Sequence, residues 1–371
     1  MTDMVDRTAN KERSFPKQEF TDSEAGALVF PSSTSRSYNY YKPAKLKATM
    51  YEDVTFDVQP DPARHLSQGW LYGFANGPGG YPLDWTKLVS EDWHQFRDPN
   101  EEWEKTIFRN NAAVVRQIGL NLENAKRAKA YAHWNSAWVH FVERNVGAWM
   151  HAENGLGMHV FITAQRCAPT NMINNAMAVN AAHKLRFAQD LALFNLDLSE
   201  SDIGFDGSVH KEVWKYDPSW QGVRENVERL TAVEDWAEAL FATNIIFEPL
   251  VGVLFRSDLL MQISARNGDY ITPTIVGTGE NDYNRDLTYT RALFSMLTKD
   301  SKNGMANKAI LNEWLSTWVP RSLHAARELQ PIWSQPHEKV ITFDDSLKSA
   351  KENFANILLN LDLEVPKELN K

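Results

Sequence analysis

The residues best suited to chemistry lie close together in the segment 265–286, ARNGDYITPTIVGTGENDYNRD. Within seven positions it is acidic and rich in amides, with Glu280, Asp282, Asn284 and Asp286, just before an apolar helical run. Helix bundles hold two irons with one Glu from each of two helices and a Glu-x-x-His pair from each of two others. The segment contains no histidine. The pattern therefore indicates either an oxygen-activating iron centre or the frame of one that has lost its metal.

A count of Glu-x-x-His pairs tests for such a centre. The sequence has one pair, Glu91 with His94, and it lies in a loop-rich region ahead of the long helices. One pair cannot supply a di-iron site. The spaced histidines, His133 with His140 and His151 with His159, have no carboxylates at ligand spacing, so we interpret them as packing or surface residues.

Composition limits the class of protein and its partners. A chain of 371 residues with 43% hydrophobic and 23% charged residues can bury a large core. The polar start lacks the features of a signal peptide, and the apolar run 245–255 is shorter than the ~20 residues of a membrane span. A lone Cys167 excludes an internal disulfide or thiolate cluster and suits a reducing cytoplasm. The net charge of −9 argues against nucleic acid as a partner. We expect a cytoplasmic protein with neither membrane nor nucleic acid as a partner.

Three regions of the chain differ in composition and in hydrophobic periodicity. Residues 1–60 hold four prolines and the patch Tyr38, Tyr40 and Tyr41, which favours an extended N-terminal arm laid over another surface. Residues 61–105 form a loop-rich segment with GFANGPGG and several tryptophans, and this glycine cluster lacks the phosphate-binding motifs. Residues 106–371 have helical periodicity and form one domain with the rest.

The periodicity predicts a mostly α protein of long helices. Apolar spacing and chain breakers place these helices at 107–148, 148–166, 176–196, 224–247, 250–265, 274–297, 305–330 and 345–361. Most of the 13 tryptophans are expected to be core or interface anchors.

Several stretches give the chain a resemblance to a known family. These are GWLYGFANGPGGYPLDWTKLVSEDWHQFRDPNEEWEKTIF, the helices around Ala152–Asn154 and AAHKLRFAQDLALF, and ARNGDYITPT followed by ENDYNRD. Together they span roughly residues 60–300. The chain resembles the β, or small, hydroxylase subunit of the bacterial soluble di-iron multicomponent monooxygenases, closest to the propane- and phenol-oxidising members.

The resemblance implies a fold, an assembly and an activity. The fold would be a ferritin-like (ribonucleotide reductase-like) long-helix bundle with an extended N-terminal arm. The α (large) subunit would bind two irons and activate O2 with electrons from an NADH-dependent reductase, under the control of a coupling protein. The β chain would pair with α, the αβ units would dimerise, and the complex would hydroxylate propane or a similar small hydrocarbon, ketone or phenol. This chain would be a scaffold with no cofactor, metal or catalytic residue of its own.

Comparison with the α-subunit pattern indicates where ligands have been lost. Glu153 keeps the first ligand position, but His183 and Arg186 fill the next pair, and Tyr283 and Asp286 fill the last. We treat these five as vestigial ligand positions. A guanidinium cannot bind a metal ion, so we hypothesise that Glu153 and Arg186 form a buried ion pair in its place. Removing Arg186 would then cost about 3–5 kcal/mol.

Two rival interpretations stay open at this point. One is an active di-iron chain with the unusual ligands Glu153, Glu248, Glu280, Asp282 and Asp286. The other is an unrelated helical binding or structural protein. A scaffold subunit should aggregate when expressed alone and be rescued by a larger ferritin-like partner, whereas a stable monomer would favour the unrelated protein.

Overall fold

The computed structural model describes residues 43–45, 48–56 and 84–370, and the chain divides into two units, Met1–Leu66 and Ser67–Lys371. In the first unit the described residues form the short helix α2 (Met50–Phe56). A reciprocal pair of bonds begins this helix: the Glu52 amide donates to the Thr49 hydroxyl (3.2 Å), and the Thr49 amide donates to the Glu52 carboxylate (3.0 Å). The predicted N-terminal arm, with Tyr38, Tyr40 and Tyr41, falls almost entirely outside the described residues, as does GFANGPGG.

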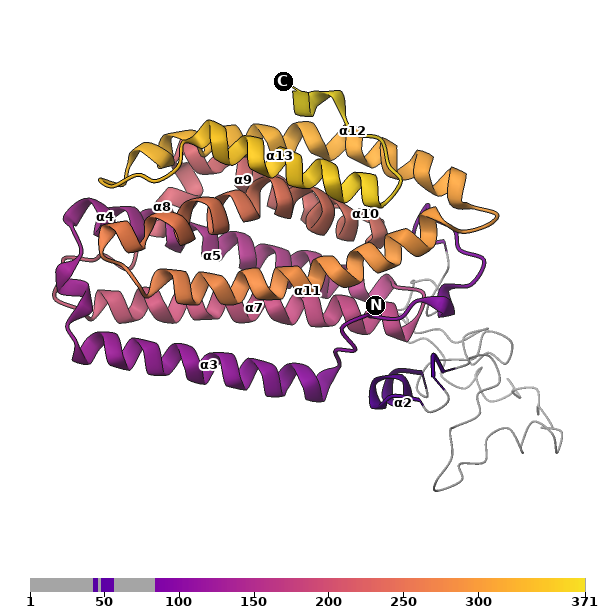
Figure 1. Cartoon of the computed structure of the whole chain (residues 1–371), viewed down its shortest axis with the longest axis horizontal. Coiled ribbons are helices and arrows are strands. Elements are labelled where there is room, and N and C mark those ends of the chain that lie inside the picture. The colour runs from indigo at the N-terminus through magenta and orange to yellow at the C-terminus, as the bar shows by residue number, and fades with distance from the viewer. Residues whose placement is uncertain (1–42, 46–47, 57–83, 371) are drawn as a thin grey trace, which may run out of the picture. The chain divides into compact units, whose positions relative to one another are not determined.

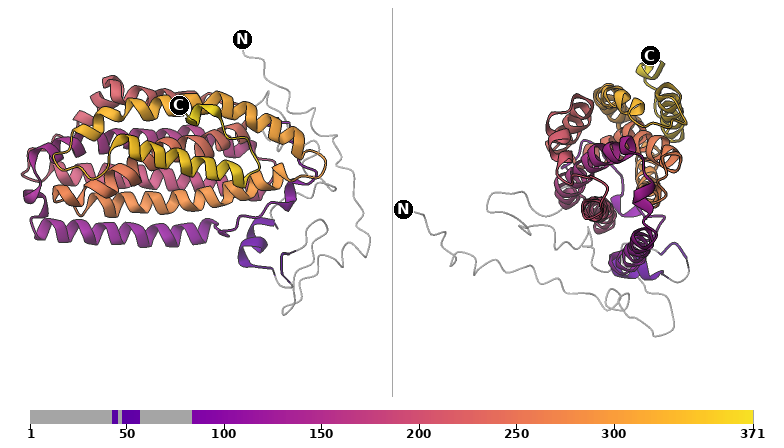
Figure 2. Two further views of the ribbon diagram at one scale, coloured as in Figure 1. Left: turned by 45° about the horizontal axis from the view of Figure 1, so that its top comes forward. Right: turned by 90° about the vertical axis from the view of Figure 1, so that its left-hand side faces the viewer.

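The second unit is a bundle of long helices that run roughly along one axis (Figures 1 and 2). No strand occurs in its described part, residues 84–370. This confirms the prediction of a mostly α, ferritin-like fold. The main helices are α3 (Glu104–Arg127), a continuous helix from α4 (Ser136–Phe141) to η5 (Gln165–Cys167), α7 (Asn171–Ser199), α8 (Val209–Tyr216), α9 (Pro218–Thr231), a continuous helix from α10 (Trp236–Leu240) to η7 (Leu254–Met261), α11 (Thr272–Thr298), α12 (Gly304–Glu328) and α13 (Phe343–Asn360).

Several predicted helix bounds were wrong. The helix expected at 224–247 is interrupted between Thr231 and Trp236, and the boundary expected at 148 lies inside a continuous helix. The helix expected at 107–148 ends at Arg127, because Lys129 adopts a left-handed conformation (φ 51°) and Asn135 caps a new helix through the Trp138 amide. The break expected at Pro249 is absent, because Pro249 lies inside the π-helical segment η6 (Phe241–Gly252). A second π-helical segment, η4 (Gly155–Phe161), follows the α5 helix (Gly147–Asn154). Such segments are frequent at functional sites.

The tryptophans anchor the core as predicted. Five of them are at most 2% exposed, namely Trp138, Trp149, Trp220, Trp236 and Trp314. Trp138 also positions the start of α11, because its indole nitrogen donates to the buried Asp269 carboxylate (2.9 Å). The other oxygen of Asp269 accepts the Thr272 amide (2.9 Å) at the first turn of α11, directly after the left-handed Gly268 (φ 81°). The motif ARNGDYITPT is therefore a helix-starting turn.

One helical stretch, Trp236–Asn267, is long and apolar enough to cross a membrane, but its most apolar window is 89% buried inside the bundle. A buried helix of this kind is also what the core of a soluble protein contains. Its neighbours in the bundle position the charged residues described next.

Candidate functional site

Five charged side chains from four of the long helices meet inside the bundle. We name this group the central cluster, and it consists of Glu153 on α5, Lys184 on α7, Glu248 on η6, Arg256 on η7 and Glu280 on α11. None of the five residues is more than 9% exposed. Charges so deeply buried must be paired to be tolerated.

Arg256 is the centre of the central cluster. Its Nη1 lies 3.1 Å from Glu153 Oε1 and its Nη2 lies 2.7 Å from Glu248 Oε2. Its Nε pairs with Glu280. The guanidinium also lies between two aromatic rings, 5.4 Å from the centre of Trp149 and 5.7 Å from that of Tyr283. One side chain thus joins three helices.

Lys184 neutralises the same carboxylates from the opposite helix. Its ammonium lies 3.2 Å from Glu153 Oε2 and also pairs with Glu248. The indole nitrogen of Trp149 donates to Glu153 Oε1 (2.8 Å). Glu153 and Glu248 are therefore each held by both cations.

The pKa shifts agree with this pairing. Burial opposes the charge of Arg256, but Glu248, Glu280 and Glu153 outweigh it and hold the pKa of the guanidinium well above its usual range. Burial opposes Lys184 too, and Glu153 and Glu248 raise the pKa of its ammonium. At Glu248, Arg256 and Lys184 outweigh burial and lower the pKa, whereas at Glu153 burial prevails and raises it. Both cations are thus fixed as charged groups.

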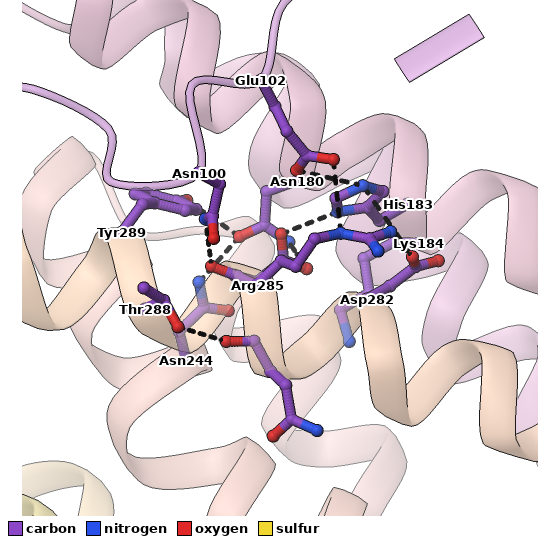
Figure 3. Close-up of polar contacts among 12 residues, drawn as sticks. Asn100, Glu102, Asn180, His183, Lys184, Asn244, Asp282, Arg285, Thr288 and Tyr289 are labelled. Carbon is purple, nitrogen blue, oxygen red and sulfur yellow. Dashed lines mark hydrogen bonds and ion pairs between the residues drawn. The ribbon is translucent and has the colours of Figure 1, made fainter. Parts of the chain in front are cut away.

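A second buried group surrounds His183, beside the central cluster (Figure 3). We name it the histidine cluster, and it consists of Glu102, His183, Arg186, Asp190, Asp282, Arg285 and Asp286. His183 Nδ1 lies 2.8 Å from Asp286 Oδ1, and its Nε2 faces Glu102 (3.7 Å) and Asp282 (3.9 Å).

The histidine cluster links three parts of the bundle. Glu102, in the segment before α3, lies 3.3 Å from Arg285 Nε on α11 and faces His183 on α7. Asn100 extends the link, because its side-chain amide donates to the Arg285 carbonyl (2.9 Å). Although burial opposes the charge of His183, Asp286, Asp282 and Glu102 raise its pKa, so the imidazolium belongs to the network.

The hypothesis of an ion pair between Glu153 and Arg186 was wrong. Arg186 pairs with Asp190 and Asp282 in the histidine cluster, while Glu153 pairs with Lys184 and Arg256. The reason is helix periodicity: Lys184 and Arg186 are two positions apart on α7 and so point to different sides. A cation of α7 does pair with Glu153, but it is Lys184, two positions before Arg186.

The arrangement of the central cluster matches the frame of a di-iron site with its ligands altered. Glu153 and Glu248 are the lone carboxylates of two helices. Lys184 follows Glu153 by 31 positions and begins Lys184-x-x-Phe187, and Glu280 follows Glu248 by 32 positions and begins Glu280-x-x-Tyr283. Each of these two segments has the i, i+3 spacing of a Glu-x-x-His pair. One Glu and both histidines are missing there.

A metal ion does not fit these residues. The ammonium of Lys184 and the guanidinium of Arg256 lie among the three carboxylates that would have to bind it. A guanidinium has no lone pair to give and cannot lose its charge in a protein. Within residues 84–370, no three His, Cys, Asp or Glu side chains are placed to hold one metal ion.

The ligand set of the active-enzyme rival is split by the structure. Glu153, Glu248 and Glu280 do meet, but around Arg256. Asp282 and Asp286 lie in the histidine cluster. The single Glu-x-x-His pair, Glu91 and His94, is also not a metal site. Glu91 pairs with Lys302, and the backbone amide of His94 donates to the Asp92 carboxylate (2.9 Å) in a short 3₁₀ turn.

Sequence reasoning missed Lys184, Arg256 and Glu102. A signal for Arg256 was available, because a charged residue that closely follows the most apolar run of the chain, IIFEPLVGVLF, needs a buried partner. Lys184 directly follows His183, which was the predicted ligand position on this helix. Glu102 lies in a loop, where no periodicity marks an inward side.

Comparisons with known proteins identify the relatives of the chain. A family model described as methane/phenol/alkene hydroxylase matches residues 70–301. The chain is 68% identical over 361 residues to the propane 2-monooxygenase hydroxylase component small subunit of Mycolicibacterium smegmatis, covering 97% of this chain and 98% of that one. It is 24% identical to the methane monooxygenase component A beta chain of Methylosinus trichosporium, covering 86% and 85%.

Solved structures show the same fold. A chain of phenol hydroxylase from Pseudomonas sp. OX1 superposes with a TM-score of 0.73 at 18% identity, covering 91% of this chain and 97% of that one. A chain of toluene 4-monooxygenase gives a TM-score of 0.68 at 20% identity, covering 82% and 99%.

Proposed function

Because the chain belongs to the methane/phenol/alkene hydroxylase family, we propose that it is a non-catalytic small subunit that holds no iron and supports an iron-bearing partner. The observation that carries this proposal is the central cluster. Its two cations occupy the space among the carboxylates that would otherwise bind metal. Glu153 and Tyr283 keep their place among the altered ligand positions, together with Lys184, Phe187, Glu248 and Glu280. His183, Arg186 and Asp286 form the neighbouring histidine cluster instead.

The ion pairs do structurally what a pair of metal ions would do. They bind carboxylates from α5, η6 and α11 to cations on α7 and η7, so the helices keep their spacing. Breaking such a pair would leave an uncompensated buried charge. The cost of that charge opposes any shift in the helix register. The bundle therefore has a rigid interior without a reactive centre.

The partner and the overall reaction follow from the relatives. Four relatives of 65–68% identity are named as small subunits of the propane 2-monooxygenase hydroxylase component. We extend this to the present chain: it pairs with a large hydroxylase subunit that carries two irons, and the αβ pairs dimerise. The complex would oxidise propane or a similar small hydrocarbon with O2, fed by an NADH-dependent reductase and regulated by a coupling protein, in the cytoplasm.

The iron content of the chain tests the non-catalytic role. The full chain is purified, loaded with Fe(II) under anaerobic conditions, desalted and analysed for iron, with the large hydroxylase subunit treated in parallel as positive control. We expect iron per chain near zero for the small subunit, because Lys184 and Arg256 repel a dication. A value close to two would overturn the proposal and make the buried carboxylates an active centre.

A further inference from the structure

Helix α7 keeps its charged residues inside the bundle together with most of its large apolar residues, and it exposes only uncharged positions, unlike a surface helix in water. Its four charged residues, Lys184, Arg186, Asp190 and Asp197, are all buried. Every position of α7 that is not buried is uncharged. These positions recur at helical spacing and are Asn171, Asn174, Asn175, Ala178, Ala182, Leu185, Gln189, Ala192, Leu193, Leu196 and Ser199.

This uncharged strip continues onto the neighbouring helix. α7 packs along α5 and η4, and Leu185 lies so close to Gly157 that a Cβ there would approach its Cγ to 2.9 Å. Next to Gly157 come Met158 (46% exposed) and, one turn on, Ile162 (39%), while Leu193 and Leu196 on α7 are 48% and 55% exposed. We name the two strips together the α5–α7 face.

We propose that the α5–α7 face is the surface on which the large hydroxylase subunit docks, through an apolar, uncharged pair of its own helices. This rests on the proposed function, which supplies the partner. Large apolar residues exposed on two packed helices, on a face whose α7 positions carry no charge, indicate an interaction site. Small residues at Ala178, Ala182 and Gly157 let a partner helix approach closely, since they add little side-chain bulk.

The size of the face suits a stable subunit contact. At ~1.5 Å per residue and ~10 Å in width, the 29 residues of α7 present a strip of roughly 400 Å². The 8 residues of α5 and the 7 of η4 add roughly 200 Å² at the same width, which brings the total to roughly 650 Å², against the ~800 Å² that each partner buries in a standard interface.

Charge favours a different chain over a second copy. Two copies of this chain each carry a net charge of −9, so their association would bring like net charges together. A large subunit with its own charge pattern avoids that repulsion. The relatives' names, which designate them small subunits or beta chains of hydroxylase components, agree with this choice.

A double substitution that introduces negative charge on the face tests the proposal. Met158→Glu with Leu196→Glu places two carboxylates on the face, and Met305→Glu with Leu359→Glu places the same changes on α12 and α13, at positions 89% and 60% exposed. The affinity of each full chain for the purified, immobilised large hydroxylase subunit is measured by surface plasmon resonance. We expect the face variant to lose at least ~100-fold, because its carboxylates would be buried without partners, and the control to stay within ~3-fold.

The remaining outcomes separate the alternatives. Failure of the wild-type chain to bind the large subunit would reject the proposed function itself. If the wild type binds and the face variant binds as tightly as the control, the docking surface lies elsewhere and this inference is overturned. It is also overturned if the isolated wild type is a dimer that only the face variant dissociates, which would identify a second copy. A melting temperature lowered in the isolated face variant alone would show that the chain's own segments cover the face, with the same result.

Discussion

Arg256 lies among three carboxylates and two aromatic rings, with 1% of its side chain exposed. Burying a guanidinium is costly, and the surrounding carboxylates offset that cost only while all of them are present. The position is therefore one where a single substitution should have a large effect on stability.

We expect Arg256→Ala to lower the free energy of unfolding by about 3–5 kcal/mol, because Glu280, Glu153 and Glu248 would keep their burial and lose a cation. Chemical denaturation monitored by circular dichroism measures the change. Arg229→Ala is the matched control: Arg229 pairs with Glu225 at 2.6 Å on the surface, with both side chains about half exposed. Its loss should cost less than ~1 kcal/mol. Equal effects of the two substitutions would mean that the central cluster does not stabilise the bundle.

Asp258 provides a test of pH dependence. Burial, and then the nearby Glu280, raise the pKa of its carboxyl to about 6, and its Oδ2 has no hydrogen-bond partner. A carboxyl whose pKa is higher in the folded state than in the unfolded chain favours folding at low pH, and this contribution is lost as the pH rises through about 6. Asp98 and Asp190 are shifted in the same direction to about 6 and the pKa of His183 is also raised, whereas the pKa of His151 is lowered to about 4 and that of His210 is lowered, so the histidine pair acts in the opposite direction. The fall in stability that Asp258 itself contributes between pH 5 and pH 8 is therefore isolated by comparing the wild type with a variant.

Asp258→Asn should remove part of that fall and stabilise the chain at pH 8 by roughly 1 kcal/mol, a value reduced for partial solvent screening. Melting temperatures of the wild type and the variant at pH 5 and pH 8 provide the measurement. Asp344→Asn, at an exposed position of α13, serves as control and should leave the difference between the two pH values unchanged. An equal difference between the two pH values in the wild type and in Asp258→Asn would contradict the expected effect.

At the scale of elements, α7 and α11 approach each other closely at Gly279. A Cβ at this position would lie 2.7–2.9 Å from the ring of Phe187, so only glycine fits without a shift. Phe187 is also the residue at the place of a metal-binding histidine in Lys184-x-x-Phe187. The aromatic ring therefore fills space between the helices and sets their separation.

Gly279→Ala should destabilise the bundle by about 1–3 kcal/mol, because the added methyl group forces the two helices or the ring apart. The same substitution at Gly119 on α3, where no atom lies within 4 Å of the new Cβ, should stabilise by about 0.5–1 kcal/mol through helix propensity. Thermal unfolding of the two variants beside the wild type gives opposite shifts if both expectations hold. A stabilising Gly279→Ala would show that the contact with Phe187 is loose.

Helix existence was predictable from the sequence, whereas helix continuity was not. Apolar periodicity placed α7, α11, α12 and α13 close to their observed bounds. It missed α8, whose eight residues give little periodicity to read, and it extended one helix through Lys129. Pro249 was read as a break, yet the π-helical segment accommodates a residue without an amide proton. Local backbone geometry of this kind has no simple pattern in residue types.

For the whole molecule, the sequence indicated which charges lie inside but not how they pair. Glu153, Glu248 and Glu280 were candidates on separate helices, and the fold brings them together. The pairing depends on the direction in which each side chain points. Glu153 was predicted to pair with Arg186, but its partner on α7 is Lys184, two positions earlier. Distances between helices decide such partners, and a single sequence contains them only indirectly.

The exposed side of α7 is also explained by where its charges lie. A water-facing helix normally keeps its charges outside, and α7 instead uses them to bind its neighbours within the bundle. The interior ion pairs and the uncharged exterior of α7 are thus two sides of one helix. A partner that covers this exterior would turn α7 into a fully buried helix of the assembly.

The internal ion pairs of the central cluster also bear on the order of assembly in the cell. Under the proposed function, a chain whose buried glutamates are paired with its own lysine and arginine would fold during iron starvation, without a metal chaperone or a supply of ferrous ion. Maturation of the enzyme would then depend on nutrient iron at one polypeptide only, with the other standing ready beforehand as a template.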